Sequence, residues 1–440
     1  MKEHLILKMR ERHPDDDRIP DWVGFIEDKS AAKASINSGI DRLLGRSGLE
    51  FWITNEFKPA GIDWDEDENR QGLDRTYRII LQKDYTLPAA LIDALKRDPS
   101  VEDARRLHVG VSEIPGARAP AAADPALSTA ASLERGFASE LIHLGYAHAL
   151  TKGNPEIKIA VLDTGVNLGH PELKGKFRKG MDFVDLNGLD TTGFIGDFIG
   201  YDEVPEDEVG HGTHVSGILS ARGLEMDEGV APGCTIIPVR VLAAMKSGPR
   251  VVGAGIIDNI NVGIKWAVDN GADVINMSLG IRHQGGGLPH EDVIRYALSK
   301  NVTVVAASGN DGTSERYYPG ALPGVIAVGA VDASGDVTPF TSYGANIHVV
   351  APGLNIYSAS LDKGYAIASG TSQASPFVCG TVGLFKSFAA ERGRTLANRD
   401  IAYILKATSD KVDSRLRNEH AGYGLINLAD AFKLLSNMLN

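Results

Sequence analysis

Residues 157–165 read Ile-Lys-Ile-Ala-Val-Leu-Asp-Thr-Gly, an apolar run that ends on the carboxylate of Asp163. Beyond it, short apolar runs alternate with segments of helical periodicity. The strand-like runs are 157–162, 235–239, 274–277, 303–307 and 325–328, and the helical segments include 214–221, 256–270, 290–300 and 376–391. Continuous apolar strands separated by helices indicate a parallel sheet that is covered on both faces. The sequence therefore predicts an α/β fold, in which sites lie beyond the carboxyl ends of the strands, where Asp163 falls.

Two further segments carry an imidazole and a hydroxyl group, which can act together with a carboxylate in catalysis. Residues 211–217 read His-Gly-Thr-His-Val-Ser-Gly, and residues 369–376 read Ser-Gly-Thr-Ser-Gln-Ala-Ser-Pro, each at a predicted helix start. Small residues around Ser372 allow close approach, and a helix N-terminus points backbone N–H groups at a developing negative charge. The chain order Asp, His, Ser is one of the orders in which a Ser-His-Asp triad occurs.

The same residue types meet the chemical needs of peptide hydrolysis. A serine hydroxyl must lose its proton to a neutral imidazole, and the imidazolium needs a carboxylate to orient it. Ser372, His211 and Asp163 fill these roles. The oxyanion needs fixed donors, which the backbone N–H of Ser372 and the side-chain amide of Asn310 supply. Asn310 follows the strand-like run 303–307, so it also belongs at a carboxyl end.

From about residue 157 to about residue 432, the chain resembles the subtilisin-like serine proteases, or subtilases. The segments that carry the resemblance are 159–165, 211–217, 273–280, 318–320, 325–331, 370–372 and 422–427. The resemblance implies a subtilisin-like three-layer fold with a mainly parallel sheet and a serine endopeptidase that cleaves proteins or peptides through an acyl-enzyme. It assigns Asp163, His211 and Ser372 to the catalytic triad and Asn310 to the oxyanion hole. It implies that no cofactor is required for the chemistry.

The resemblance also implies where a substrate binds. Ser278, Leu279 and Gly280 correspond to the backbone wall of the primary pocket, with which an extended substrate pairs as an added strand. Residues 253–255 fall where the opposite pairing edge is expected. Gly309 is expected to line the pocket. Asp311 is expected at its rim, where it would favour a basic side chain at P1, the residue on the amino side of the cleaved bond.

The first 111 residues have a different pattern, with the order β-α-β-β-α-β. The expected elements are 4–8, 31–44, 49–57, 77–81, 87–95 and 101–109, with an acidic loop at 63–69. This order predicts a small ferredoxin-like α+β domain. Residues 95–102 resemble the last helix and strand of the subtilase propeptide, a chaperone whose tail inhibits the active site. We therefore expect a zymogen with a propeptide domain at 1–111 and a catalytic domain at 132–440. The Pro/Ala-rich linker at 112–131 contains or adjoins the processing site.

Some acidic residues leave more than one interpretation open. Glu172, Glu225 and Asp227 are either oxygen ligands of a structural calcium ion or part of a solvated loop, and the metal ligands stay unassigned. His348 stands where some relatives carry an acidic ligand, so a weaker cation site is not expected. The acidic segment 182–208 is a solvated loop, a cation site or a fence that prefers basic substrates.

Three other side chains have predicted structural roles. His214 follows three residues after His211 and is expected to be structural, because no metal-protease glutamate accompanies it. Cys379 is expected to be buried apolar filler. Gln373 replaces the methionine usual after the nucleophile, so its amide is expected to be hydrogen-bonded or exposed.

Composition limits the partners and the location. The net charge of −12 gives no reason to expect nucleic acid or an anionic membrane as a partner. Two cysteines allow one disulfide at most, and the charged N-terminus does not resemble a signal peptide. A cytoplasmic protein is expected, inhibited by its own N-terminal domain until cleavage or a regulatory protein partner releases it. A subtilase-fold transpeptidase or macrocyclase and an inactive binding protein are the alternatives.

Overall fold

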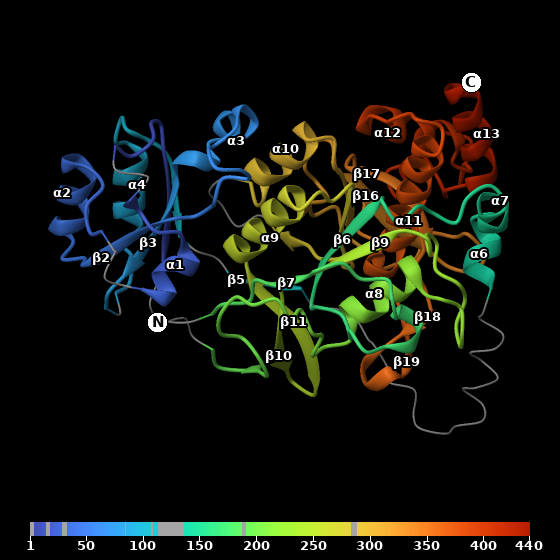
Figure 1. The fold of residues 1–440 in the computed structure, drawn as a ribbon, viewed down its shortest axis with the longest axis horizontal. Helices are drawn as coiled ribbons and strands as arrows, with labels where there is room; N and C mark the ends of the chain where they lie inside the picture. The colour runs from blue at the N-terminus through green and yellow to red at the C-terminus, as the bar shows by residue number, and fades with distance from the viewer. Residues whose placement is uncertain are drawn as a thin grey trace.

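The computed structural model contains an N-terminal α+β domain followed by a larger α/β domain (Figure 1). It describes residues 4–14, 18–28, 33–83, 85–106, 109–112, 136–186, 191–282 and 288–440. The predicted linker lies outside these residues, apart from Ser112. Within the described residues, no helix is both long enough and apolar enough to cross a membrane.

The N-terminal domain is a four-stranded antiparallel sheet with helices, in the strand order β2-β3-β1-β4. Its strands are Leu5–Met9 (β1), Phe51–Asn55 (β2), Thr76–Leu81 (β3) and Val101–Arg106 (β4). Its helices are Trp22–Glu27 (α1), Ser38–Arg46 (α2), Glu66–Gln71 (α3) and Ala89–Lys96 (α4). The first strand lies between the third and the fourth, which is the arrangement of the predicted split motif.

The predicted acidic loop at 63–69 is wrong, because α3 begins inside it. The side chain of Asp65 accepts hydrogen bonds from the backbone N–H groups of Asp67 and Glu68. The side chain of Glu68 accepts in return from the N–H of Asp65 over 2.8 Å. This reciprocal pair is a capping box, which satisfies free N–H groups at a helix start. Acidic residues in the first turn also interact favourably with the helix dipole.

The α/β domain is built on a seven-stranded parallel sheet with the order β17-β16-β14-β12-β6-β9-β7. In that order its strands are Ile347–Pro352, Ile326–Val331, Thr303–Ala307, Val274–Met277, Lys158–Asp163, Thr235–Arg240 and Met181–Asp182. Its longer helices are His211–Ser220 (α8), Ile257–Asp269 (α9), Glu291–Ser299 (α10), Thr371–Ala390 (α11), Asn398–Thr408 (α12) and Leu428–Leu439 (α13). Two short ones are Phe137–Leu141 (α6) and Leu144–His148 (α7).

Alternating side chains of the central strands supply two separate cores. In β6, Ile159 and Val161 pack with α8, α11 and α13, whereas Ala160 and Leu162 pack with α9 and α10. Successive residues of a strand point to opposite faces of a sheet. The predicted α/β fold with a sheet covered on both faces is therefore confirmed, and it has three layers.

Shorter strands form a second sheet beside the main one. Its order is β5-β11-β10-β8, with the bounds Val109–Ser112, Arg250–Ile256, Ala243–Ser247 and Phe194–Ile195. Two further two-stranded sheets pair Ile281–Arg282 (β13) with Tyr317–Tyr318 (β15), and Ile356–Ala359 (β18) with Tyr365–Ala368 (β19). The last strand of the N-terminal part, β5, thus pairs with a strand of the α/β domain.

Candidate active site

Asp163 and His211 form a buried hydrogen-bonded pair at the carboxyl end of β6. The Nδ1–H of His211 donates to Oδ1 of Asp163 over 2.6 Å, and the two side chains are 3% and 0% exposed. Asp163 ends β6 and His211 begins α8, so a strand end and a helix start hold the pair. A carboxylate in this position fixes the tautomer and orientation of an imidazole. The other ring nitrogen, Nε2, is buried and has no hydrogen-bond partner within the described residues.

Asp207 connects the loop after β6 to the start of α8. Its Oδ1 accepts from the hydroxyl of Thr164 over 2.8 Å and from the backbone N–H of Gly210 over 2.9 Å. Its Oδ2 accepts from both the N–H and the hydroxyl of Thr213. These bonds satisfy N–H groups that a helix start leaves without partners. Asp207 therefore fixes the direction in which α8 presents His211.

Ser372 is the second residue of α11 and lies against Ser278, which follows β12. The hydroxyl of Ser372 donates to the carbonyl of Ser278 over 3.0 Å, and the hydroxyl of Ser278 donates to the carbonyl of Ser372 over 2.8 Å. The second bond forms because Pro376 has no N–H to donate to the residue four positions earlier. The proline thus frees an acceptor that anchors the segment around Ser372 to the end of β12.

Thr371 holds the side-chain amide of Asn310 in one orientation. The N–H and the hydroxyl of Thr371 donate to Oδ1 of Asn310 over 2.8 and 3.0 Å. The same hydroxyl accepts from the N–H of Gly309 over 3.2 Å. Because the amide oxygen is occupied, the Nδ2 group with its two N–H donors is the end left for a ligand.

The electrostatics of the site favour a proton on His211. Burial lowers the pKa of an imidazole, but the charge and the hydrogen bond of Asp163, together with the charge of Asp207, outweigh it and raise the pKa of His211 above 6.5. For His214, burial dominates and lowers the pKa to about 4. The Nε2 of His214 faces the carbonyls of Ile356 and Ala366, as expected for a structural histidine.

The residues expected to bind substrate lie near Ser372. The residues expected to form the pocket wall, Ser278, Leu279 and Gly280, follow the end of β12, and the carbonyl of Ser278 accepts from the hydroxyl of Ser372. Gly309 contacts Thr371 through its N–H. Asp311 contacts Arg282 and the hydroxyl of Tyr317, so its carboxylate already has a cation and a donor.

The opposite edge, at residues 253–255, is occupied by the chain itself. β5 pairs antiparallel with β11, so that Gly253 faces Ser112 and Gly255 faces Gly110. β5 also contacts β13, which begins directly after Gly280. An extended segment of the N-terminal part therefore lies between the two edges predicted to bind substrate.

Comparisons with known proteins identify the family. The model of the Subtilase family matches residues 154–424, which is more than half of the chain. The chain belongs to the subtilase family. It is 39% identical over 288 residues to the thermophilic serine proteinase of Bacillus sp. (strain AK1), a match that covers 65% of this chain and 64% of that protein. It is 38% identical over 257 residues to thermitase of Thermoactinomyces vulgaris, covering 58% of this chain and 81% of thermitase.

Two further relatives widen the comparison. The major intracellular serine protease of Bacillus subtilis (strain 168) is 36% identical over 241 residues, which cover 53% of this chain and 70% of that protein. The structure of the prenylagaramide maturation protease PagA superposes with a TM-score of 0.54 and 29% identity, covering 67% of this chain and 98% of that one. This subtilase is thus similar to serine endopeptidases, and its fold is a subtilase fold.

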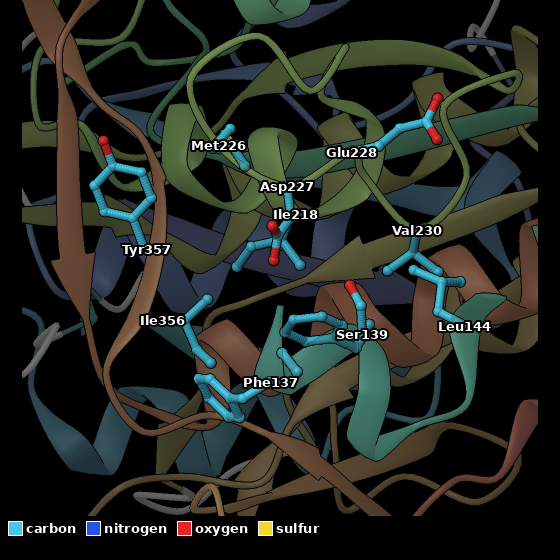
Figure 2. Close-up of a pocket in the computed structure, with 12 residues that line it drawn as sticks. Phe137, Ser139, Leu144, Ile218, Met226, Asp227, Glu228, Val230, Ile356 and Tyr357 are labelled. Carbon is cyan, nitrogen blue, oxygen red and sulfur yellow. The ribbon is translucent and has the colours of Figure 1, made fainter. Parts of the chain in front are cut away.

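Two of the three candidate calcium ligands of this subtilase, Glu172 and Asp227, already accept hydrogen bonds from backbone N–H groups. Glu172 accepts hydrogen bonds from the backbone N–H groups of Leu224 and Glu225, so its carboxylate faces donors. Asp227 accepts from the N–H of Gly136 over 2.7 Å. It lines a small cavity of about 30 Å³ with room for one or two waters (Figure 2). No group of three or more His, Cys, Asp and Glu side chains suited to a metal occurs among the described residues.

The acidic segment between Asp163 and His211 has a structural role that the sequence did not suggest. Asp182 contacts the buried Arg240, which also pairs with Glu208 over 2.8 Å. Asp185 accepts from the indole N–H of Trp22 in the N-terminal domain over 3.0 Å. The carboxylates of Asp182, Asp185 and Glu208 thus pair with cations and donors of the protein itself.

The expectation for Gln373 is wrong. Its side chain is 0% exposed, and neither Oε1 nor Nε2 has a hydrogen-bond partner among the described residues. A buried amide without partners has a desolvation cost. Cys379, by contrast, is buried and free, as expected for a filler residue.

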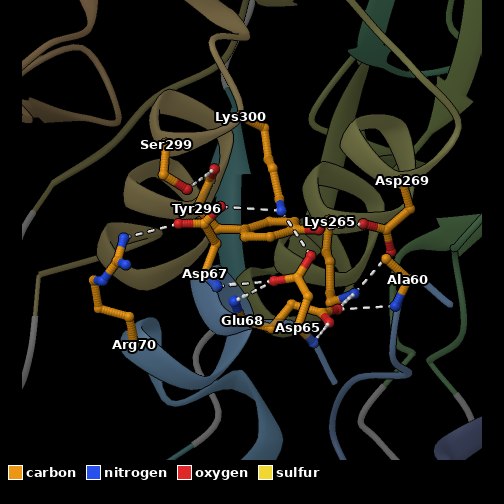
Figure 3. A network of polar contacts seen from close by, with 10 residues as sticks. All are labelled: Ala60, Asp65, Asp67, Glu68, Arg70, Lys265, Asp269, Tyr296, Ser299 and Lys300. Atoms are coloured by element: carbon orange, nitrogen blue, oxygen red, sulfur yellow. Dashed lines mark hydrogen bonds and ion pairs between the residues drawn. The ribbon is translucent and has the colours of Figure 1, made fainter. Parts of the chain in front are cut away.

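A buried ion-pair network joins the N-terminal domain to α9 and α10 (Figure 3). The ammonium of Lys265 in α9 lies 2.6 Å from Glu68 of α3 and 2.7 Å from Asp269. The side chains of Lys265 and Glu68 are 3% and 0% exposed. Nearby, Lys300 pairs with Asp65 over 2.6 Å at a more exposed position. The two domains therefore share a desolvated interface.

Proposed function

We propose that this subtilase is a serine endopeptidase that hydrolyses peptide bonds through Asp163, His211 and Ser372, with Asn310 in the oxyanion hole. The observation that carries the proposal is the buried 2.6 Å bond between Asp163 and His211, at the start of α8, a helix that contacts α11, which carries Ser372. It leaves Nε2 of His211 without another partner within the described residues, ready to accept a proton.

The chemistry begins when the hydroxyl of Ser372 turns from the carbonyl of Ser278 toward His211. Nε2 takes the hydroxyl proton as Oγ attacks the substrate carbonyl, and Asp163 stabilises the imidazolium. The oxyanion receives hydrogen bonds from Nδ2 of Asn310 and the N–H of Ser372. His211 then protonates the leaving amine, which leaves an acyl group on Ser372. Water deprotonated by His211 hydrolyses this ester and restores the serine.

Residues 1–111 act in this proposal as an inhibitory propeptide domain. Support comes from β5, which takes the place of a substrate strand along β11, and from the buried pairing of Glu68 with Lys265. The processing bond is therefore proposed within or beside the linker 112–131, with the catalytic domain at 132–440. The two buried free cysteines fit the predicted cytoplasmic location, which stays a prediction.

Two measurements test the proposal. A fluorophosphonate should label the wild type at Ser372 and leave Ser372→Ala unlabelled. Intact-mass analysis should show a cut within or beside residues 112–131 in the wild type and a full-length chain in Ser372→Ala. A wild type that neither labels nor cleaves peptides after removal of the N-terminal domain would be the inactive binding protein. Masses of cyclic or ligated products, without hydrolysed peptide, would point to a transpeptidase or macrocyclase.

A further inference from the structure

The ring of Tyr317 fills the space between two glycines near the nucleophile. A β-carbon added to Gly309 would lie 2.4 Å from Cδ2 of Tyr317, and one added to Gly280 would lie 3.2 Å from its Cβ. Tyr317 reaches this place because β15 pairs antiparallel with β13, which sets Tyr317 opposite Arg282. The ring thus packs directly on the backbone at both glycines.

The space between residues 278–280 and 309–310 lies where a substrate bound at Ser372 would place its P1 side chain. On one side, the carbonyl of Ser278 accepts from the hydroxyl of Ser372 over 3.0 Å. On the other, Gly309 precedes Asn310 and donates to Thr371, the residue before the nucleophile. The P1 side chain is bonded to the α-carbon next to the attacked carbonyl carbon. It must therefore enter between the segments 278–280 and 309–310.

We propose that Tyr317 closes the inner part of the P1 pocket and restricts this protease to substrates with a small P1 side chain, such as alanine or serine. The inference rests on the proposed function and names its substrate class. A phenylalanine at P1 would need the volume that the ring of Tyr317 occupies, and interiors do not accept such overlap without displacement.

Charged groups around the ring are already paired with one another. Nε of Arg282 donates to the hydroxyl of Tyr317 over 2.8 Å and lies 2.8 Å from Glu315. Asp311 contacts both Arg282 and the hydroxyl of Tyr317. The cation and the carboxylate nearest the pocket therefore neutralise each other and hold the ring in place. Neither is left to select an oppositely charged P1 residue.

The experiment compares peptide substrates that differ only at P1. Wild type, Tyr317→Ala and Tyr317→Phe are prepared side by side as the full chain, and reactive Ser372 is counted by fluorophosphonate titration. We expect wild type to prefer Ala over Phe at P1 by about tenfold or more in kcat/KM. In Tyr317→Ala, the opened volume should shift this ratio toward Phe by about tenfold to a hundredfold, the value of burying an aromatic side chain.

Matched controls separate ring volume from hydrogen bonding and from folding. Tyr317→Phe keeps the ring and loses the hydroxyl, so it should keep the preference for Ala. Tyr317→Leu, a second variant with a partly filled pocket, should give an intermediate ratio. In Asp311→Ala, the ratio of Lys to Leu at P1 should equal that of wild type. Thermal unfolding checks that each variant is folded.

Each outcome bears on one proposal or on both. Titrated enzyme that cleaves Phe and Ala peptides equally, or a Tyr317→Ala ratio equal to that of wild type, overturns the role of Tyr317 and leaves the protease proposal intact. If Ser372 labels but peptides are not turned over, labelling rates of peptidyl phosphonates with Ala or Phe at P1 give the same ratio. No labelling of any folded variant overturns both proposals.

Discussion

The carboxylate of Asp207 accepts a hydrogen bond from the hydroxyl of Thr164, and the 2.8 Å contact joins the segment after Asp163 to the helix that begins with His211. The N–H of Gly212 donates to the same hydroxyl, so both halves of the Asp-His pair share one buried anchor. Burial lowers the pKa of His211, Asp163 outweighs it, and the negative charge of Asp207 adds to the rise.

Asp207→Asn should therefore shift the fall of kcat/KM at low pH, its acid limb, to lower pH. Because His211 must be neutral to accept a proton, activity falls as the pH drops through its pKa, which lies above 6.5 in the wild type. Removing the charge of Asp207 lowers that pKa, so the acid limb of kcat/KM should shift to lower pH. A pH profile from 5 to 9 measures it. An unchanged limb with a lower plateau would show that Asp207 acts only on geometry.

Thr371 should affect the rate of catalysis by holding the side chain of Asn310 in place. Asn310→Ala removes the proposed oxyanion donor and should lower kcat by about a hundredfold to a thousandfold with little change in KM. Thr371→Val loses the hydroxyl that donates to Oδ1 but keeps the backbone N–H, so we expect a smaller loss, of about tenfold. Thr371→Ser retains the hydroxyl and is the matched control. If Thr371→Val lowered kcat further in the Asn310→Ala background, Thr371 would act by another route.

Local patterns predicted much of the fold and supplied the residues proposed as the triad. The apolar runs around Asp163 and Asn310 were recognisable because parallel strands are buried on both faces. The helix α3 was missed because an acidic run resembles a loop, although Asp65 and Glu68 have the spacing of a capping box. A search for that spacing would have found it.

Contacts between distant segments could not be predicted in the same way. Asp207 lies in a segment rich in carboxylates, and composition does not distinguish a buried carboxylate from a solvated one. Its position four residues before His211 was the one available signal. The packing of Tyr317 on Gly280 and Gly309 depends on the pairing of β13 with β15, which no local pattern specifies.

The buried pair between Lys265 and Glu68 should dominate the docking of the N-terminal domain. Lys265→Met leaves Glu68 buried without its cation, a change that costs about 3–5 kcal/mol. If the docked domain covers the site, fluorophosphonate labelling of Ser372 in the full chain should become more than tenfold faster. Lys300→Met removes a more exposed pair and should have little effect. Labelling in Glu68→Leu/Lys265→Met should return toward the wild-type rate, because an apolar pair replaces both charges.

Acid should weaken the same docking through His290. Its imidazole is 2% exposed and lines a cavity of about 330 Å³ between the domains. The charged residues around this cavity are Lys8, Glu102, Asp103, Arg105, Glu291, Asp292 and Arg295. Burial, with the charge of Arg105, lowers the pKa of His290 to about 3. When the N-terminal domain undocks, the imidazole of His290 becomes hydrated and its pKa returns from about 3 toward 6.5. At pH values between these two, the undocked chain therefore binds more protons than the docked chain.

Lowering the pH from 7.5 to 5.5 should therefore shift the docking equilibrium about tenfold toward the undocked state. Hydrogen exchange of the amides of β5 and β11, corrected for intrinsic rates, measures this shift in Ser372→Ala, where the chain stays uncut. His290→Gln keeps a donor for Asn261, which His290 contacts over 2.6 Å, and cannot titrate. This variant should show a smaller pH dependence than its parent. Equal pH dependence in both chains would show that His290 does not carry the effect. Burial raises the pKa of Glu102, but Lys8 and Arg75 outweigh it and hold this pKa below 4.5, so Glu102 stays ionised over this pH range.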